Sequence, residues 1–143
     1  MAIQQGLTNS FKQDMVNGQQ SLLYDSLWIA LYTSFATLGP DTVYYGVAHE
    51  VLGGPTTGYE NGGQELVNVT VNTDPTTGIV YVNFGNVVWN SVTFTARGAL
   101  IYNKTQGDRS VAVLDFGSDK VATNTFTVTM PINSPTTALL RFT

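Results

Sequence analysis

The residues best suited to chemistry are scarce in this chain, which contains one histidine, His49, and no cysteine. A histidine-based nucleophilic triad would need His49 together with an orienting acid and an activated nucleophile. Glu50 is the only carboxylate near it in sequence, and no Gly-x-Ser-x-Gly elbow occurs. The composition also excludes disulfides, thiolate zinc sites and metal sites built from several histidines. We therefore interpret His49 as a surface residue of a loop.

Carboxylates are the remaining candidates for catalysis or metal binding. Asp115 and Asp119 lie in the run DFGSDK, and Asp108 precedes them across an expected hairpin. Calcium takes about six to eight oxygen ligands, usually several from one loop, whereas these acids are spread over strand ends and turns. The triplet DFG lacks the other protein-kinase motifs. Nothing favours a carboxylate pair for glycoside hydrolysis. We predict a protein that is not an enzyme, with no catalytic residues, no cofactor and no metal.

Exposed aromatic side chains could instead bind a sugar or another protein. Tyr44, Tyr45 and Tyr59 lie in or beside a long loop and are candidates for such a contact. Consecutive residues of a strand point to opposite faces, so at least one of Tyr44 and Tyr45 is expected to face inward. Packing in the core or at an interface is the favoured interpretation of all three, and a carbohydrate platform is the alternative.

The charge balance narrows the class of partner. The 143 residues include six basic and ten acidic side chains, which give a net charge of −4. A chain so poor in cations cannot neutralise many phosphates, so no nucleic-acid partner is expected. Charged residues make up 11% of the chain, under half of the ~25% typical of soluble domains. Because interface cores are depleted in charge, this composition suggests a subunit packed among neighbours.

The distribution of apolar and basic residues indicates whether the chain carries a targeting or membrane-spanning segment. The first residues contain neither a basic segment nor an apolar one, and no apolar run approaches the ~20 residues that cross a bilayer. We expect a soluble protein without a signal peptide or a membrane partner.

Residues 7–17 are the one convincing helical segment. Leu7, Phe11 and Met15 recur every fourth residue and therefore share a face. Thr8 or Asn9 can cap the start of the helix, and Gly18 follows its end. A helix of about three turns is marginal alone, so its apolar stripe must pack on something. The core of the same domain is the favoured partner, and a neighbouring subunit is the alternative.

The rest of the chain predicts short strands separated by turns. Residues 49–63 hold too many glycines for a regular element, and residues 74–78 (DPTTG) predict a turn between two strands. The expected strands cover residues 26–34, 42–47, 65–72, 79–84, 87–95, 98–103, 110–116, 123–130 and 137–142.

This spacing predicts an all-β fold: an antiparallel β-sandwich or jelly roll of eight or nine strands with one short N-terminal helix. We expect an N-terminal arm and helix over residues 1–20 and a single β-sandwich domain over residues 21–143.

Four segments carry a resemblance to known proteins, namely QGLTNSFKQDMVNG, LWIALYTSFATLG, GPTTGYENGGQEL and FTARGALIYNKTQGDRSVAVLDFGSDK. Together they resemble a family of small structural proteins of tailed phages, over residues 4–142. Residues 96–103 (ARGALIYN) and 112–117 (AVLDFG) are its most specific parts. The resemblance implies a virion protein assembled in the host cytoplasm, and within that group it is most similar to head decoration, or cement, proteins on the outer capsid surface.

The resemblance further implies that the partners are the major capsid protein and sister subunits, commonly in a homotrimer, and it brings no catalytic residue. A clamp that bridges capsomers needs only a rigid β core and adhesive loops or termini, because several weak contacts reinforce one another. We expect Leu7, Phe11 and Met15, or the loop over residues 48–63, to contact the capsid or a sister subunit. Deletion of residues 1–17 is then expected to abolish capsid binding and leave a folded domain. A tail, neck or fibre-associated subunit and a host-surface carbohydrate-binding module are the alternatives.

Overall fold

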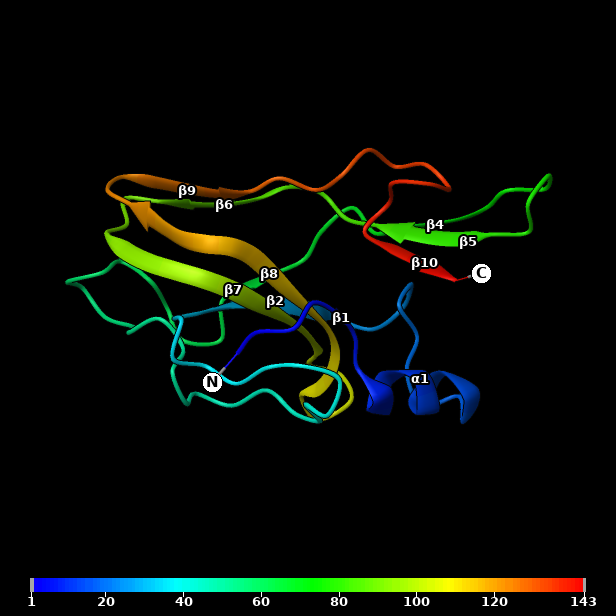
Figure 1. Cartoon of the computed structure of the whole chain (residues 1–143), viewed down its shortest axis with the longest axis horizontal. Helices are drawn as coiled ribbons and strands as arrows, with labels where there is room; N and C mark the ends of the chain where they lie inside the picture. The colour runs from blue at the N-terminus through cyan, green and yellow to red at the C-terminus, as the bar shows by residue number, and fades with distance from the viewer. Residues whose placement is uncertain (1, 143) are drawn as a thin grey trace.

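A five-stranded antiparallel sheet forms one layer of the fold, which a computed structural model describes for residues 2–142 (Figure 1). β2 lies inside this sheet and is apolar on both faces, because each face meets its own cluster of buried side chains. Leu27, Ile29 and Leu31 face the main core, whereas Ala30 and Tyr32 face a smaller cluster. The strands in spatial order are β1 (Gly6–Leu7), β8 (Arg109–Ala122), β7 (Phe94–Asn103), β2 (Leu27–Tyr32) and β3 (Gln64–Glu65).

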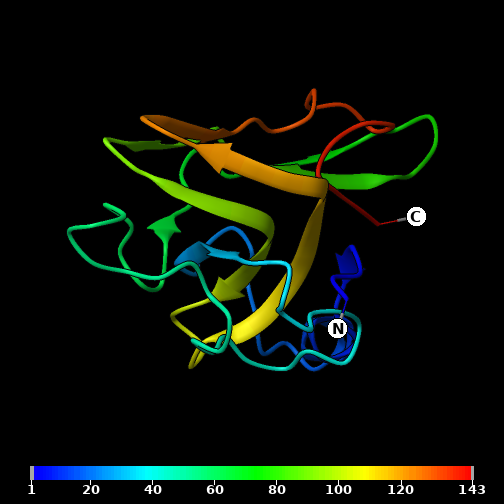
Figure 2. The same ribbon diagram turned by 60° about the vertical axis from the view of Figure 1, so that its left-hand side comes forward.

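Two smaller antiparallel sheets form the opposite layer, as the rotated view makes clear (Figure 2). They are the three-stranded sheet β10 (Leu140–Phe142), β5 (Val80–Asn83) and β4 (Thr70–Thr73), and the pair β6 (Val87–Asn90) and β9 (Thr125–Val128). Trp89, Phe94 and Phe126 fill the space between the layers at one end, with ring centroids 5.2 to 6.0 Å apart for the contacting pairs. The chain is therefore an all-β sandwich.

The hairpin of β7 and β8 connects the two layers. Its register shifts twice, between Ala96 and Gly98 and between Ile101 and Tyr102, and such bulges bend a strand. At Gly98 the strands approach closely, since a Cβ atom there would lie 2.6 Å from the Leu114 carbonyl oxygen. β8 consequently runs from the large sheet toward the level of β9 (Figure 2).

Helix α1 (Asn9–Val16) closes one end of the sandwich beneath β10 (Figure 1). Thr8 caps it, because its hydroxyl accepts a hydrogen bond from the Phe11 backbone N–H. The Phe11 ring is fully buried and lies 6.3 Å from the Phe142 ring. Since β1 pairs with β8 just before the helix, residues 6–16 are built into the β domain.

The expected fold class, the helix, its Thr8 cap and the β4–β5 and β7–β8 hairpins are confirmed. Several expected strands are wrong in presence or extent, and β8 continues to Ala122, beyond the expected end at residue 116. Residues 42–47 form no strand and make one isolated bridge, Tyr44 with Arg109. The strands expected over residues 65–72 and 87–95 are each broken, at Asn68 and Ser91, where φ is +55°. Within the described residues the structure has ten strands rather than the expected eight or nine, because the segment over 65–72 divides into β3 and β4 and because β1 was not expected, whereas the strand over 42–47 is lost. The break at Ser91 adds no strand, since the residues after it join the expected strand over 98–103 in β7. No helix within residues 2–142 is long and apolar enough to cross a membrane.

Candidate interaction surface

The long loop between Tyr45 and Gln64 is fastened to the large sheet at both of its ends. The Tyr32 hydroxyl donates a hydrogen bond to the Gly46 carbonyl, and the Tyr102 hydroxyl donates one to the Gly62 carbonyl, each at 2.7 Å. In the middle of the loop, the Val51 N–H donates to the Leu31 carbonyl of β2 at 2.9 Å. Three segments of the loop are thus attached to rigid strands.

Glu50 organises the interior of this loop. Its carboxylate is buried and accepts four hydrogen bonds, all between 2.6 and 3.1 Å. The donors are the hydroxyls of Tyr45 and Tyr59, the side-chain amide of Asn61 and the backbone N–H of Gly62. A buried carboxylate is costly without such partners, so these contacts are mutually dependent.

Four tyrosines surround Glu50, and their pKa values follow from this burial. Desolvation raises the pKa of Tyr32, Tyr45, Tyr59 and Tyr102 well above the ordinary value of a tyrosine, and the negative charge of Glu50 adds to the effect. The rings of Tyr45 and Tyr102 also stack with centroids 4.6 Å apart. All four phenols are therefore neutral donors at physiological pH. We call these tyrosines and Glu50 the Glu50 cluster.

Large apolar side chains project from the loop that the Glu50 cluster holds. Val47 is 67% exposed and Leu52 is 76% exposed, and on the neighbouring turn Phe35 is 62% exposed. The Phe35 ring lies 6.3 Å from the His49 ring, and Thr33 holds the His49 carbonyl with both its N–H and its hydroxyl. We call Phe35, Val47, His49 and Leu52 the loop surface.

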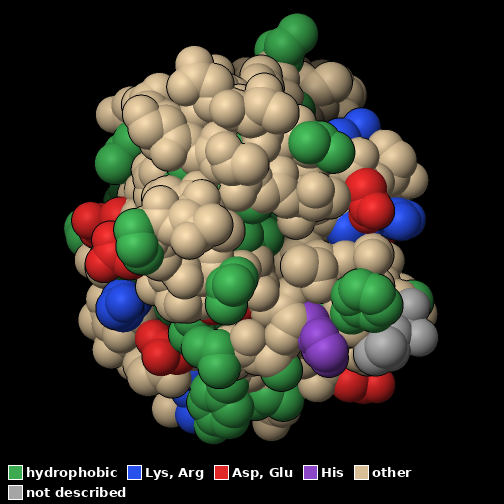
Figure 3. Space-filling view, turned by 90° about the vertical axis from the view of Figure 1, so that its left-hand side faces the viewer, with side chains coloured by type: hydrophobic (Ala, Val, Ile, Leu, Met, Phe, Trp, Pro, Cys, Tyr) green, Lys and Arg blue, Asp and Glu red, His purple; other side chains and the backbone are tan. Residues whose placement is uncertain are grey.

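A space-filling view shows the histidine with exposed hydrophobic side chains near it, among mostly uncharged surface (Figure 3). Exposed apolar groups on a rigid support are typical of interaction sites, because a partner can cover them at little cost in chain entropy. The loop surface is therefore the candidate interaction site.

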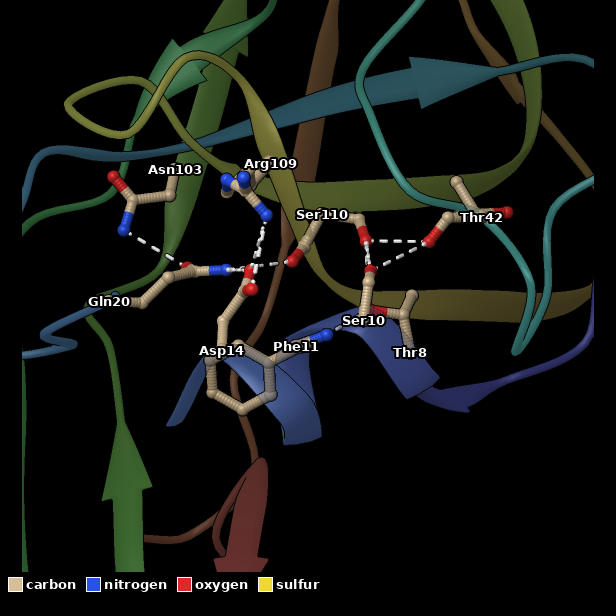
Figure 4. A network of polar contacts seen from close by, with 9 residues as sticks. All are labelled: Thr8, Ser10, Phe11, Asp14, Gln20, Thr42, Asn103, Arg109 and Ser110. Carbon is tan, nitrogen blue, oxygen red and sulfur yellow. Dashed lines mark hydrogen bonds and ion pairs between the residues drawn. The ribbon is translucent and has the colours of Figure 1, made fainter. Parts of the chain in front are cut away.

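A second buried polar cluster fixes α1 to the β7–β8 hairpin (Figure 4). Asp14 of α1 is buried, and its carboxylate lies 3.1 Å from Nη1 of Arg109. Gln20 donates to Asp14 at 2.9 Å and accepts from Asn103 at 3.0 Å. Asn103 also donates to Asp25 at 2.8 Å, so the network extends from the helix to the end of β7.

The same hairpin is joined to the start of α1 through hydroxyl groups. Ser110 lies 2.8 Å from the Thr8 hydroxyl and donates to the Thr42 carbonyl at 2.7 Å. Within residues 2–142, no buried side-chain nitrogen or oxygen lacks a hydrogen-bond partner. The buried polar side chains of both clusters therefore find all their hydrogen-bond partners within the protein.

The structure separates the residues that the sequence suggested for an interface. Phe11 and Tyr59 are fully buried in the core, which confirms the favoured expectation of core packing for Phe11 and is consistent with that for Tyr59, and which rules out the alternative that these two side chains contact a partner. Leu7 is half-buried against the core, whereas Met15 is 39% exposed at the end of the helix. Deletion of residues 1–17 would remove Phe11 from the core together with β1 and Asp14, so the expected survival of a folded domain is also revised.

The three tyrosines considered as a sugar platform do not share a surface. Tyr44 is exposed and lies beside Arg109, whose guanidinium carbon is 5.9 Å from the ring centroid. Tyr45 faces inward and Tyr59 is buried, and the hydroxyl of each donates a hydrogen bond to the Glu50 carboxylate. The expectation that one of the two consecutive tyrosines faces inward is confirmed.

The carboxylates that suggested a cation site do not form one. No group of three or more His, Asp or Glu side chains within residues 2–142 is placed to hold a metal ion. Asp115 instead accepts from the Gly117 N–H at 2.9 Å and pairs with Arg97 at 3.3 Å, and these contacts lower its pKa.

Sequence reasoning missed the role of Glu50, which it treated only as a neighbour of His49. The one available signal was a lone carboxylate in a glycine-rich loop with tyrosines before and after it. No protein-family model, curated protein or solved structure matches the chain.

Proposed function

We propose that this protein is a non-enzymatic structural subunit of a phage virion that binds the outer surface of the capsid and stabilises the shell. The observation that carries the proposal is the loop surface, a group of exposed apolar side chains on a loop that buried hydrogen bonds hold rigid. The resemblance of residues 4–142 to small structural proteins of tailed phages supplies the class of partner.

The architecture supports a binding role in two ways. A loop held by the Glu50 cluster loses little conformational freedom when it docks, so more of the contact energy appears as affinity. The surface is also poor in charge, at 11% of residues for the whole chain, so docking requires little desolvation of ions. Weak apolar contacts of this kind are effective on a shell, where many identical sites are bridged at once.

The test is binding of purified protein to tailless heads from which the decoration protein has been stripped. We expect saturable binding, with one copy or a few for each capsomer. The variant Phe35→Ser, Val47→Ser, Leu52→Ser removes the apolar part of the loop surface without touching the Glu50 cluster. Each lost contact of this size is worth about 1.5–3 kcal/mol when fully buried, so we expect binding at least about tenfold weaker.

The matched control is Val16→Ser, Val121→Ser, Ile132→Ser, which alters three equally exposed apolar side chains elsewhere. We expect it to bind heads like the unmodified protein. Equal binding by both variants would place the capsid contact on another surface. Absence from heads together with incorporation into tails would contradict the proposal and favour a tail subunit.

A further inference from the structure

Strand β4 is an open edge of the three-stranded sheet, and the Asn133 side-chain amide donates a hydrogen bond to the Thr70 hydroxyl at its start. The sheet order is β10-β5-β4, so one side of β4 has no strand beside it. The Asp74 N–H bonds to Ile79 on the β5 side, and strand geometry alternates, so Val71 and Thr73 direct their N–H and C=O groups outward. All four residues of β4 are exposed.

Proteins usually protect such edges with a charge, a proline, a bulge or a covering loop. Residues 66–73 contain no charged residue and no proline, and β4 pairs with β5 without a register shift. The other edges differ. β1 and β3 have two residues each, Gln64 donates to the Val88 carbonyl of β6, and Lys120 lies in the groove beside β9. Within residues 2–142, β4 is therefore an edge without these protections, whereas β10, the other edge of the same sheet, has three residues and carries Arg141.

An apolar groove of about 420 Å³ adjoins the same edge on the inner face of the sheet. Val71 lines it and is 42% exposed, and Met15 and Leu22 also line it. The apolar inner face of this sheet thus extends from the buried Val82 on β5 to the partly exposed Val71 on β4, which is its last strand.

We propose that β4 pairs antiparallel with β4 of a second copy of this chain, about a two-fold axis with Val71 opposite Val71 of the second copy. In this register the two Val71 residues exchange both of their hydrogen bonds, and Thr73 faces Val69 of the second copy. The inner face is then continuous from one copy to the other, with β-branched side chains opposite one another. On the outer face, Thr70 faces Asn72, so polar groups meet polar groups.

Local charge is compatible with a copy of the same chain at this edge. A chain with a net charge of −4 repels itself where its acids meet. In the proposed register the nearest acid, Asp74, lies opposite Asn68 of the second copy, and no like charges face each other. Asn68 has a φ of +55° and ends the strand, which limits the pairing to residues 69–73. The inference does not depend on the proposed function, and it predicts an even number of copies in any assembly.

The absence of cysteine from the chain permits a direct test. Cα atoms of directly opposed residues in such a pair lie about 5.5 Å apart, within the range of a disulfide. Val71→Cys should form a disulfide-linked dimer under mild oxidation at least about tenfold faster than Val121→Cys, because pairing raises the effective thiol concentration. Val121 is a suitable control, since it is 72% exposed on β8.

Two further measurements fix direction and stoichiometry. A mixture of Val69→Cys and Thr73→Cys should give the cross-linked heterodimer in preference to either homodimer, which only an antiparallel register centred on Val71 produces. Mass photometry of the unmodified protein should show an even number of copies, and Val71→Lys should reduce it while Val121→Lys should not. A monomer or a trimer at every concentration, with Val71→Cys no faster than Val121→Cys, would overturn the pairing and leave capsid binding untouched.

Discussion

The Tyr59 hydroxyl donates a hydrogen bond to Oε2 of Glu50 at 2.6 Å and accepts one from the Leu31 backbone N–H at 2.9 Å. One phenol therefore connects the carboxylate inside the loop to a central strand of the large sheet. The conformation of the loop surface therefore depends on its attachment to the folded core. Changes to the carboxylate, the phenols or the backbone beside them test this dependence.

Replacement of Glu50 by glutamine keeps the size of the side chain and places an amide donor among four donors. We expect the free energy of unfolding to fall by about 2–3 kcal/mol, because a charge-assisted acceptor is lost and a buried donor is left unpaired. Urea unfolding measures the change. Glu60→Gln is the control, since Glu60 is exposed in the same loop, and it should stay within about 0.5 kcal/mol. Equal effects of the two variants would show that the Glu50 cluster does not hold the loop.

Alkaline pH should unfold the protein through its tyrosines. Burial raises the folded-state pKa of Tyr32, Tyr45, Tyr59 and Tyr102 above the value of 10.0 that applies when the chain is unfolded. Below pH 10 both states keep these protons, so the stabilisation is complete. Above pH 10 the unfolded chain releases them and the folded chain does not, so stability falls by about 1.4 kcal/mol per pH unit for each fully buried phenol.

Absorbance of phenolate and near-ultraviolet circular dichroism, followed together, test this expectation. The four cluster tyrosines should ionise only as the tertiary signal is lost. Ionisation of all seven tyrosines of the chain with the native signal intact would contradict it.

Two glycines with similar backbone conformations separate steric contact from conformational strain. Gly63 has a φ of +82°, and a Cβ atom on it would lie 1.7 Å from the Ile29 carbonyl oxygen. Gly78 has a φ of +75° in the β4–β5 turn, with nothing within 4 Å. Gly78→Ala should cost about 1–2 kcal/mol, from backbone strain alone. Gly63→Ala should cost about 3 kcal/mol or more, because the loop must also move away from β2. Thermal unfolding of both variants provides the comparison, and similar losses would contradict the close approach.

The contact of Asp14 with Arg109 should make the helix a stabilising element. Asp14→Ala removes a buried acceptor from both Arg109 and Gln20, and we expect it to cost about 2–3 kcal/mol, since Arg109 remains partly in water. Asp119→Ala is the control, an exposed acid on β8. Chemical unfolding of the two proteins measures the difference. No greater loss for Asp14→Ala would show that the network in Figure 4 contributes little.

Strong periodic patterns determined which elements the sequence could predict. β2 is apolar and pairs with β7 along its whole length, so pattern and structure agree there. β8 is apolar only in its first half and continues to Ala122 through exposed residues, which the apolar pattern did not predict. Residues 42–47 carry the same apolar and aromatic pattern, yet they pair with the start of β8 only at the single bridge of Tyr44 with Arg109, and the Tyr45 side chain turns to Glu50. A sequence pattern reports which side chains suit a strand and does not report whether a partner is present.

Backbone conformation and long-range partners set the limit of the prediction elsewhere. Asn68 and Ser91 adopt positive φ because the chain must change sheets there, a requirement of the whole fold. Glu50 depends on donors at positions 45, 59, 61 and 62, which only the folded loop brings together. The helix was predictable because its cap and apolar spacing are local, and the favoured interpretation that its apolar stripe packs on the core of the same domain is confirmed for Phe11.

The contact between Thr8 and Ser110 joins residues 102 positions apart in the chain, and Gln5 reaches the Asp115 N–H across 110 positions. During synthesis, the first sixteen residues therefore emerge from the ribosome long before the strand that completes them exists. Phe11 must therefore remain without its packing partners until β8 has been synthesised. The interval in which this apolar segment is uncovered is the period when a chaperone would bind it.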